Sequence, residues 1–349
     1  TENVVFDKNT TVAYVPSDTY TGDLKWETTS QFNVGVDLSL FNNRLRMTAD
    51  YYRKKTTDLL NNVEMPRSSG YTTALRNIGS IRNSGFELQL DGRIIDRAVK
   101  WDLGVNFSLN RSKVLVLSED KDIFGGELDN TILKDQLNLM RVGEPMYVFY
   151  GYVEDGYDEN GHIVYKNMDD DPAITAADKT IIGDPNPDFL VNLTTAVSYK
   201  GFTLSAFFQS SIGNDIYSLS MAAQAYDYGY NGNTLREVYY NHWTPENPTA
   251  KYPNLDQTSY KMSDRFVYDG SFVRLKNLEL AYDVPCARNK FIKRARVYVS
   301  AQNLFTITSY PFWDPDINAN GGGSSMIQGV DSYCYPSART YTIGCRLTF

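Results

Sequence analysis

The chain has 349 residues with 34 lysines and arginines, 42 aspartates and glutamates and two histidines, so its formal net charge is −8. This charge argues against a nucleic-acid binder, which needs a basic face, and two histidines argue against a histidine-rich metal centre. Only 42% of the residues are hydrophobic and 26 are tyrosines, while no apolar run approaches the roughly 18 residues of a membrane helix. Such a composition fits a soluble β-protein or a membrane β-barrel, whose alternating strands are half polar.

The first predicted strand covers residues 24–40, because apolar and polar side chains alternate there. In residues 31–40 (QFNVGVDLSL) every second residue is apolar, from Phe32 to Leu40. A strand sorts such residues onto two faces, whereas a helix would scatter them around its circumference. Asn42 and Asn43 follow, and asparagine tolerates positive φ, so we predict a tight hairpin turn into a second strand.

The same alternation recurs along the chain and predicts nine strands. Within 271–284 the apolar face switches between Leu275 and Leu278, which predicts a β-bulge. The segment 146–153 (MYVFYGYV) is also strand-like, but one more crossing would break the alternation of direction, so we assign it to a loop. The predicted strands are 24–40, 44–59, 80–95, 100–117, 188–200, 202–216, 271–284, 293–308 and 337–349.

The connections between these strands alternate in length. The short ones are 41–43, 96–99, 200–201 and 285–291. The long ones are 60–77, 118–187, 217–270 and 309–335. Transmembrane barrels of the outer-membrane type have short turns on one side and long loops on the other. We therefore predict an all-β fold, an antiparallel transmembrane β-barrel segment, with an outer loop segment at 1–23 and the barrel part at 24–349.

An odd strand number argues that the predicted barrel is incomplete, because bacterial single-chain barrels have even numbers. Nine strands alone would form an open sheet with two unpaired edges. In lipid, each unsatisfied backbone group on such an edge costs several kcal/mol. We therefore expect these residues to be the C-terminal part of a larger barrel.

Five stretches of sequence motifs extend from one end of the chain to the other. They are KWE at 25–27; NIGSIRNSGFE at 77–87; IGDPNPDF at 182–189; WTPENP at 243–248 with YP at 252–253 and FVRLKNL at 272–278; and AQNLF at 301–305 with YPSARTY at 335–341 and the terminal Phe349. In this order they resemble the C-terminal half of the SusC/RagA-type TonB-dependent outer-membrane transporters of Bacteroidetes.

The resemblance implies a barrel of 22 strands, a size associated with plugged outer-membrane transporters. It places the plug domain and the TonB box N-terminal to residue 1. It also implies TonB-dependent active import of a large nutrient, an oligosaccharide or an oligopeptide, across the outer membrane, with a SusD-like surface lipoprotein as a lid. The expected partners are the plug and the rest of the barrel, the lipoprotein, TonB, the cargo and the lipid bilayer, with no nucleic acid.

The acidic loop 165–179 (YKNMDDDPAITAADK) carries oxygen ligands at the spacing of an EF-hand-type calcium loop. Side chains at loop positions 1, 3, 5 and 12 and a carbonyl at position 7 come from Asn167, Asp169, Asp171, Asp178 and Ala173. Pro172 departs from that pattern, since it stands where glycine usually makes the sharp turn. A solvated acidic loop and a bound calcium ion are the two interpretations, and no cofactor is otherwise required.

Two long loops carry aromatic rings that can stack on a sugar face or clamp a peptide. The candidates are Tyr226, Tyr228, Tyr230, Tyr239, Tyr240, Trp243, Phe312 and Trp313. Packing within the loops and contact with the lipoprotein lid are the alternatives, because protein interfaces are also rich in tyrosine and tryptophan. We favour packing for any single residue, and contact with cargo or lid for the group.

Signals for an enzyme are weak. His162 and His242 lie in different loops, and no GxSxG motif occurs, so we predict no enzymatic activity and no catalytic residues. Two other interpretations stay open at this point. One is a secreted, soluble β-rich enzyme that acts on polysaccharide, and the other is a complete small outer-membrane barrel that serves as a receptor or adhesin.

Overall fold

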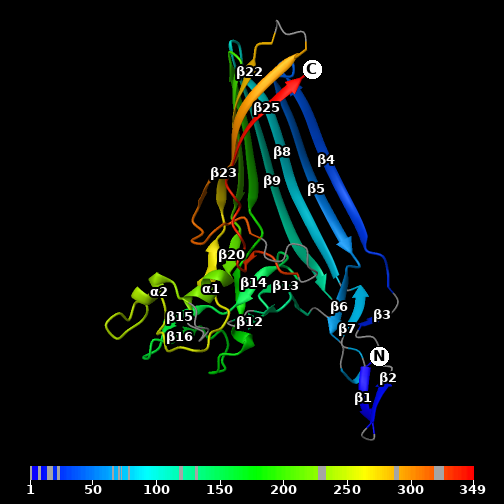
Figure 1. Cartoon of the computed structure of the whole chain (residues 1–349). Coiled ribbons are helices and arrows are strands. Elements are labelled where there is room, and N and C mark those ends of the chain that lie inside the picture. Colours follow the sequence, from blue (N-terminus) through cyan, green and yellow to red (C-terminus); the bar gives the residue numbers. More distant parts are fainter. Residues whose placement is uncertain are drawn as a thin grey trace.

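A single large antiparallel sheet dominates the protein (Figure 1). The computed structural model describes residues 2–6, 9–13, 19–21, 24–64, 67–69, 71, 73–77, 79–117, 121–129, 133–226, 233–286, 291–317 and 326–349. We call the nine-stranded sheet the wall. In spatial order its strands are β25 (Thr340–Thr348), β23 (Arg294–Thr308), β22 (Phe272–Val284), β19 (Phe202–Ile212), β18 (Phe189–Tyr199), β9 (Val99–Leu117), β8 (Gly79–Asp96), β5 (Leu45–Thr57) and β4 (Thr28–Leu40).

These nine strands confirm the predicted strands, and the turn chemistry explains how they connect. Asn42 and Asn43 adopt φ values of 55° and 65°, and Lys200-Gly201 turns the chain with φ values of 48° and 83°. Positive φ at both central residues matches the twist of the strands on either side. The predicted bulge is also present, as a register shift between Leu275 and Asn277. The segment 146–153 does not join the wall, because its strand β14 (Val148–Gly151) belongs to another sheet.

Each wall strand presents apolar side chains on one face and polar side chains on the other. One apolar row crosses eight strands through directly paired residues: Leu38, Met47, Leu90, Val105, Leu193, Phe208, Leu275 and Phe305. The neighbouring row on the opposite face is Asp37, Thr48, Gln89, Asn106, Asn192, Gln209, Arg274 and Thr306. The alternation seen along one strand is therefore kept in register across the sheet.

The wall is open, because its outermost strands β4 and β25 do not pair with each other. Much of the apolar face is exposed, including Phe32, Val36 and Ile343. A water-soluble sheet would cover such a face with a second layer, so this surface is built for an apolar environment.

A second region, the loop body, lies at the end of the wall opposite the short turns (Figure 1). It consists of the described residues within 121–187, 213–271 and 309–339. Its strands are β10 (Ile123–Phe124), β11 (Leu128–Asp129), β12 (Lys134–Asp135), β13 (Asn138–Met140), β14, β15 (Glu154–Tyr157), β16 (Ile163–Tyr165), β17 (Thr180–Gly183), β20 (Asp215–Ser218), β21 (Val267–Asp269) and β24 (Val330–Asp331).

Short helices complete the loop body. They are α1 (Leu219–Ala225), α2 (Arg236–Tyr240) and the 3₁₀ helices η3 (Ala176–Asp178) and η4 (Asp264–Phe266). Ser218 caps α1, since its side chain accepts a hydrogen bond from the Met221 N–H. Among the described residues, no helix has the length and apolar character needed to cross a membrane.

The N-terminal part of the chain forms small sheets at the same end as the loop body (Figure 1). β1 (Glu2–Phe6) pairs with β2 (Asn9–Ala13) in a hairpin. β3 (Thr19–Thr21) pairs in parallel with β7 (Thr73–Asn77), which also pairs with β6 (Leu60–Glu64); the 3₁₀ helix η1 (Arg67–Ser69) lies between β6 and β7.

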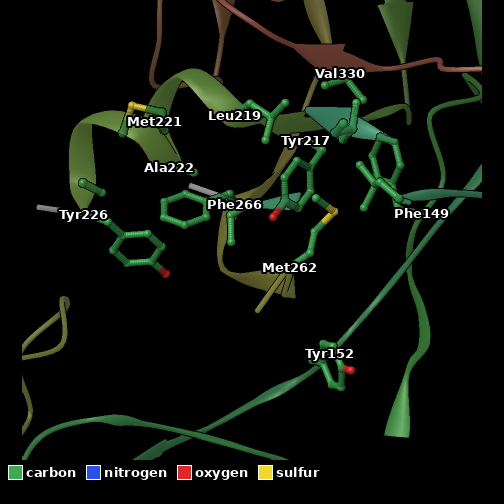
Figure 2. Packing of buried hydrophobic residues seen from close by; sticks show 14 of the residues in the cluster. Phe149, Tyr152, Tyr217, Leu219, Met221, Ala222, Tyr226, Met262, Phe266 and Val330 are labelled. Atoms are coloured by element: carbon green, nitrogen blue, oxygen red, sulfur yellow. The ribbon is translucent and has the colours of Figure 1, made fainter. Parts of the chain in front are cut away.

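The hydrophobic core of the protein lies in the loop body (Figure 2). Phe149 and Tyr217 pack edge to face, with ring centroids 6.2 Å apart, and Met262 and Phe266 pack into the same cluster. All four side chains are fully buried. They come from β14, β20 and the 262–266 segment, so this cluster joins three distant parts of the chain.

Candidate functional site

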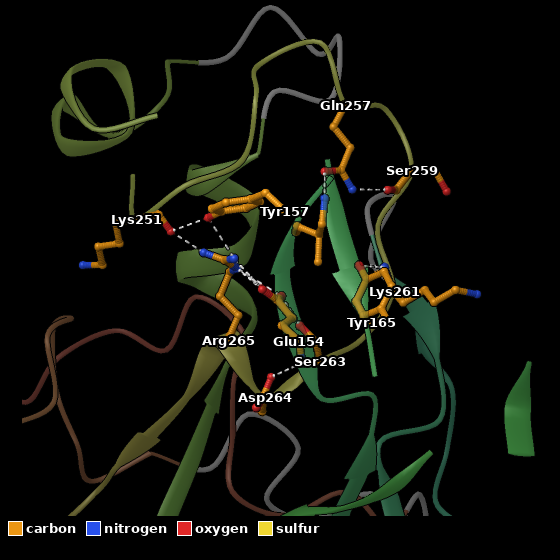
Figure 3. A network of polar contacts seen from close by, with 11 residues as sticks. Glu154, Tyr157, Tyr165, Lys251, Gln257, Ser259, Lys261, Ser263, Asp264 and Arg265 are labelled. Atoms are coloured by element: carbon orange, nitrogen blue, oxygen red, sulfur yellow. Dashed lines mark hydrogen bonds and ion pairs between the residues drawn. The ribbon is translucent and has the colours of Figure 1, made fainter. Parts of the chain in front are cut away.

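A buried ion pair holds the loop body in shape (Figure 3). The Arg265 Nε donates to both carboxylate oxygens of Glu154 at 3.0 and 2.8 Å, and its Nη2 donates to the same carboxylate. Ser263 Oγ donates to Glu154 at 2.6 Å, and the third Arg265 nitrogen, Nη1, donates to the Lys251 carbonyl. Both charged side chains are therefore paired and largely buried, which anchors the segment around Lys251 to strand β15.

A second buried contact ties the segment after strand β23 to strands β20 and β24. The hydroxyl of Tyr310 lies 2.5 Å from Asp331 Oδ2 and 2.8 Å from Ser218 Oγ. Burial and the neighbouring Asp331 carboxylate raise the pKa of Tyr310 above its ordinary value. Ser220 Oγ donates to Asp331 as well. The segment that carries Phe312 and Trp313 is thus held in place at Tyr310, close to its start.

Tyr226 is a core residue, which corrects its place among the candidate ligand-binding residues. Its ring stacks on Tyr260 with centroids 3.6 Å apart and packs edge-on against Phe266 at 5.2 Å. Only 4% of the residue is exposed, so it offers no surface to a cargo molecule. Tyr228 and Tyr230 lie outside the described residues.

Tyr239 and Tyr240 are exposed to 61% and 70%, more than Tyr226, the other candidate tyrosine that the structure describes. They lie on the short helix α2 at the periphery of the loop body, with rings packed edge to face at 5.1 Å (Figure 1). Trp243 follows the helix and is only partly exposed. Its indole packs so closely against the Gly161 backbone that a Cβ added at Gly161 would overlap the ring. We call Tyr239, Tyr240 and Trp243 the aromatic rim of the loop body. Tyr239 and Tyr240 are exposed, whereas Trp243 is packed against Gly161.

Phe312 and Trp313 form a stacked pair, with centroids 4.8 Å apart and planes 18° apart. Phe312 packs against the core, whereas Trp313 is 54% exposed and lines a cavity of about 360 Å³ on the polar face of β22 and β23. Only Trp313 of this pair is therefore available to a ligand.

Sequence reasoning missed the charged group beneath that cavity. Arg274 is only 1% exposed, donates to Asp314, and lies 3.3 Å from Asp316 Oδ2. Burial by itself would raise the pKa of Asp314, but N–H groups of Ser337 and Asp316 and the Arg274 guanidinium hold it below its ordinary value. Arg274 belongs to the FVRLKNL motif, so the motif marked the position without revealing its partner.

The acidic loop is organised by its own backbone. Asn167, Asp169 and Asp171 each accept a hydrogen bond from the N–H two residues further on, at 2.8 to 3.1 Å. Asp178 is buried and accepts from the Met168 and Thr175 N–H groups, both at 2.7 Å, which lowers its pKa. Among the described residues, no three His, Cys, Asp or Glu side chains converge as metal ligands. Calcium binding, with Ala173 as carbonyl ligand, stays a prediction.

The polar face of the wall has a second hollow at the short-turn end. This cavity has a volume of about 620 Å³ and is lined by charged side chains that include Arg44, Asp91, Arg93 and Asp102. Arg93 Nε donates to Asp102 at 2.9 Å, and both side chains are about half exposed. The surface of this hollow carries charges of both signs.

The architecture and the sequence together identify the family. The sequence profile described as TonB dependent receptor-like, beta-barrel matches residues 7–304. The chain belongs to this family of TonB-dependent receptor barrels. Its proteins are outer-membrane transporters and not enzymes, so the wall is a section of a transmembrane barrel, its apolar face meets lipid, and the protein's place is the outer membrane.

Curated TonB-dependent receptors match nearly the whole chain. TonB-dependent receptor P3 of Formosa agariphila is 34% identical over 96% of the chain and 35% of its own length. TonB-dependent receptor SusC of Bacteroides thetaiotaomicron is 29% identical over 94% of the chain and 32% of its own length. The chain therefore spans about a third of the length of these relatives. The resemblance to SusC/RagA-type receptors is confirmed.

Solved structures of TonB-dependent receptors agree. The RagAB peptide transporter superposes with a TM-score of 0.81 at 28% identity, covering 100% of this chain and 38% of that one. The RagAB peptide importer in its closed-closed state gives 0.79 at 29% identity, covering 94% and 36%. These matches favour the transporter over a soluble polysaccharide-acting enzyme or a small receptor barrel.

Proposed function

We propose that this chain is the C-terminal wall section of a TonB-dependent importer that moves a large nutrient across the outer membrane. The observation that carries the proposal is the open wall itself, apolar on one face and polar on the other. Backbone groups on the edges of β4 and β25 need partners inside a bilayer, so more strands must close the barrel. The polar face then lines the conduit.

The plug domain of the complete importer is the proposed occupant of the concave side. The charged hollow around Arg44, Asp91, Arg93 and Asp102 lies at the short-turn end, which is the periplasmic end of such barrels. Half-exposed charges of both signs suit a contact that must release and reform, because solvent screens them. Energy coupling through TonB belongs to that plug.

The aromatic rim of the loop body supports a SusD-like lipoprotein as partner. Tyr239 and Tyr240 are exposed neighbours on α2, and tyrosine is enriched in protein interfaces. Trp313 lines the cavity on the polar face of β22 and β23 and is a candidate for contact with cargo. The cargo class is an oligosaccharide or an oligopeptide; the RagAB relative is a peptide transporter.

The test is made in cells with the complete gene. Deleting the gene should abolish TonB-dependent uptake of one class of fluorescently labelled oligosaccharides or oligopeptides, and complementation should restore it. Replacing Tyr239 and Tyr240 together by alanine should weaken co-purification of a surface lipoprotein about tenfold. Tyr335→Ala, an exposed tyrosine in another loop, is the matched control. Unchanged uptake of both classes after deletion would refute the proposal.

Calcium binding by the acidic loop is a separate proposal, supported by the regular turns at Asn167, Asp169 and Asp171. Millimolar Ca²⁺ should slow proteolysis of the loop 165–179 in the complete protein, and Asp169→Ala should remove the effect. Equal cleavage with Ca²⁺ and with a chelator would leave the solvated loop as the interpretation.

A further inference from the structure

A group of basic residues lies on the apolar face of the wall, at the end that carries the long loops. Along β9 the residues that alternate onto this face are apolar from Trp101 to Leu109, and the next two are Arg111 and Lys113. Trp101 to Leu109 spans nine residues, and a tilted strand crosses the hydrocarbon core in about 9–11 residues. Arg111 and Lys113 therefore lie where the apolar interior of the bilayer ends.

The neighbouring strands β5 and β8 place further basic residues beside these two. The preceding row on the same face is apolar and runs from Tyr51 through Phe86 to Leu109. The next two rows of directly paired residues are Arg53–Ser84–Arg111 and Lys55–Arg82–Lys113. Paired strands lie about 4.8 Å apart, and every second residue of a strand lies about 7 Å further along it. The five basic residues therefore occupy an area of roughly 7 by 10 Å, which is the size of one lipid headgroup.

Four of these five side chains have no acidic partner within the described part of the chain. Arg111 is the exception, since its Nη2 donates to Asp188 Oδ1 at 2.6 Å and its Nη1 donates to the Pro187 carbonyl. The described ion pairs include none of the other four, of which three are exposed and Arg82 is half-buried. We call these four residues the basic patch: Arg53, Lys55, Arg82 and Lys113.

The basic patch is confined to three neighbouring strands. Near the same end of the wall, the paired row on the apolar face of β18, β19, β22 and β23 is uncharged: Val191, Ser210, Val273 and Ile307. On β4, Phe32 and Ser30 stand beside Arg53 and Lys55. Basic side chains that only reach for water near a membrane surface have no reason to gather on three strands. The clustering of unpaired cations therefore indicates a concentrated negative partner.

We propose that the basic patch binds the phosphate groups of a phosphorylated glycolipid in the outer leaflet, of the lipid A class. The apolar face of the wall meets lipid, and the long loops of outer-membrane barrels lie outside the cell. The patch is therefore level with the headgroups of the outer leaflet. Arginine and lysine form charge-assisted hydrogen bonds with phosphate. Four cations within one headgroup's width fit an anion with several charges better than a single phosphodiester. This lipid contact goes beyond nutrient import and does not depend on the cargo.

Native mass spectrometry of the complete transporter, released from detergent, measures the binding of lipids. The probes are diphosphoryl lipid A, the same lipid A after phosphatase treatment, and phosphatidylglycerol. We expect the wild type to bind diphosphoryl lipid A most tightly. The patch variant combines Arg53→Gln, Lys55→Gln, Arg82→Gln and Lys113→Gln. It should bind this lipid at least about tenfold more weakly, because each basic side chain near an anionic surface contributes about fivefold.

A control variant removes the same number of charges at the short-turn end. It combines Arg97→Gln, Lys100→Gln, Lys293→Gln and Arg294→Gln, all at exposed positions, and should bind diphosphoryl lipid A like the wild type. An equal loss of affinity in the two variants would show general charge attraction and overturn the proposal. Phosphatidylglycerol bound as tightly as diphosphoryl lipid A would also overturn it.

The comparison of the two lipid A forms needs no variant. If the wild type binds the phosphatase-treated form as tightly as the diphosphoryl form, phosphate is not recognised and the proposal is wrong. Heat-dependent gel mobility verifies that the barrel of each variant has folded. The wild-type comparison decides the question even if the patch variant fails to assemble.

Discussion

The wall and the loop body bury their apolar side chains in opposite ways. In the wall, Phe32, Val36 and Ile343 stand exposed on the apolar face, and the polar side chains lie on the opposite face. In the loop body, Phe149 and Phe266 are fully buried and the charged pair Glu154–Arg265 is enclosed with them. One chain therefore contains two regions built for different solvents.

The contrast teaches where each region obtains its stability. The loop body behaves like a water-soluble domain, which gains free energy by removing apolar surface from water. The wall has no core of its own and depends on lipid outside and on backbone pairing within the sheet. Substitutions of one chemical type should therefore have effects that depend on the region and on the face of the sheet.

The largest effect is expected from Arg265→Ala in the loop body. It leaves the buried Glu154 carboxylate without its cation, and breaking such a pair costs about 3–5 kcal/mol. Proteinase K digestion of the complete protein should show rapid cleavage in the loop body. The matched control is Arg111→Ala, which breaks a half-exposed pair with Asp188 at a cost of about 0–1 kcal/mol. Equal sensitivity of the two variants to proteinase K would contradict the expected difference between the buried and the half-exposed ion pair.

Val105→Arg should destabilise the wall by about 2–4 kcal/mol, because the arginine side chain would point into the bilayer core. Val105 pairs with Leu90 and Leu193 on the apolar face. Asn106→Arg places the same charge on the polar face and should cost little. Unfolding free energies in phospholipid vesicles measure both. If Asn106→Arg were the worse variant, the two faces would be assigned the wrong way round.

Gly85→Ala should cost about 1–3 kcal/mol through overpacking. An added Cβ would lie 2.5 Å from the Leu109 carbonyl oxygen and 2.6 Å from the Tyr52 ring, whose hydroxyl is held by Asn110. Gly104→Ala is the control, since its Cβ would first meet the carboxylate end of Asp91 at 3.1 Å. Thermal unfolding of the purified transporter compares them, and an equal loss would show that the Tyr52 contact is unimportant.

The smallest effect is a pH dependence confined to the acidic loop. Backbone N–H groups of Met168 and Thr175 lower the pKa of Asp178 in the folded protein. The ionised Asp178 carboxylate therefore stabilises the folded loop fully at neutral pH. This stabilisation begins to fall below pH about 4 and is lost as the pH drops through the lowered pKa. Proteolysis of residues 165–179 should accelerate on acidification, and Asp178→Asn should show less change with pH. A loop that loosens as the pH rises would contradict this sign.

Local sequence patterns were sufficient for the wall. Period-two alternation predicted its nine strands, and the asparagine pair at 42–43 predicted a turn that the positive φ values confirm. The face switch near Leu275 predicted the bulge. These features were predictable because a strand sorts neighbouring residues onto two faces, and a turn depends on the φ that its own residues tolerate.

The loop body depended on contacts that no local pattern records. Arg265 and Glu154 are 111 positions apart, and Asp314 reaches Arg274 across 40 positions. Tyr226 resembled an exposed binding residue by composition, but its stacking on Tyr260 buries it. The sequence by itself determined the strands, their faces and the family. Only the tertiary structure decided which loop aromatics are accessible and which charges pair, because those outcomes depend on the path of the chain between distant residues.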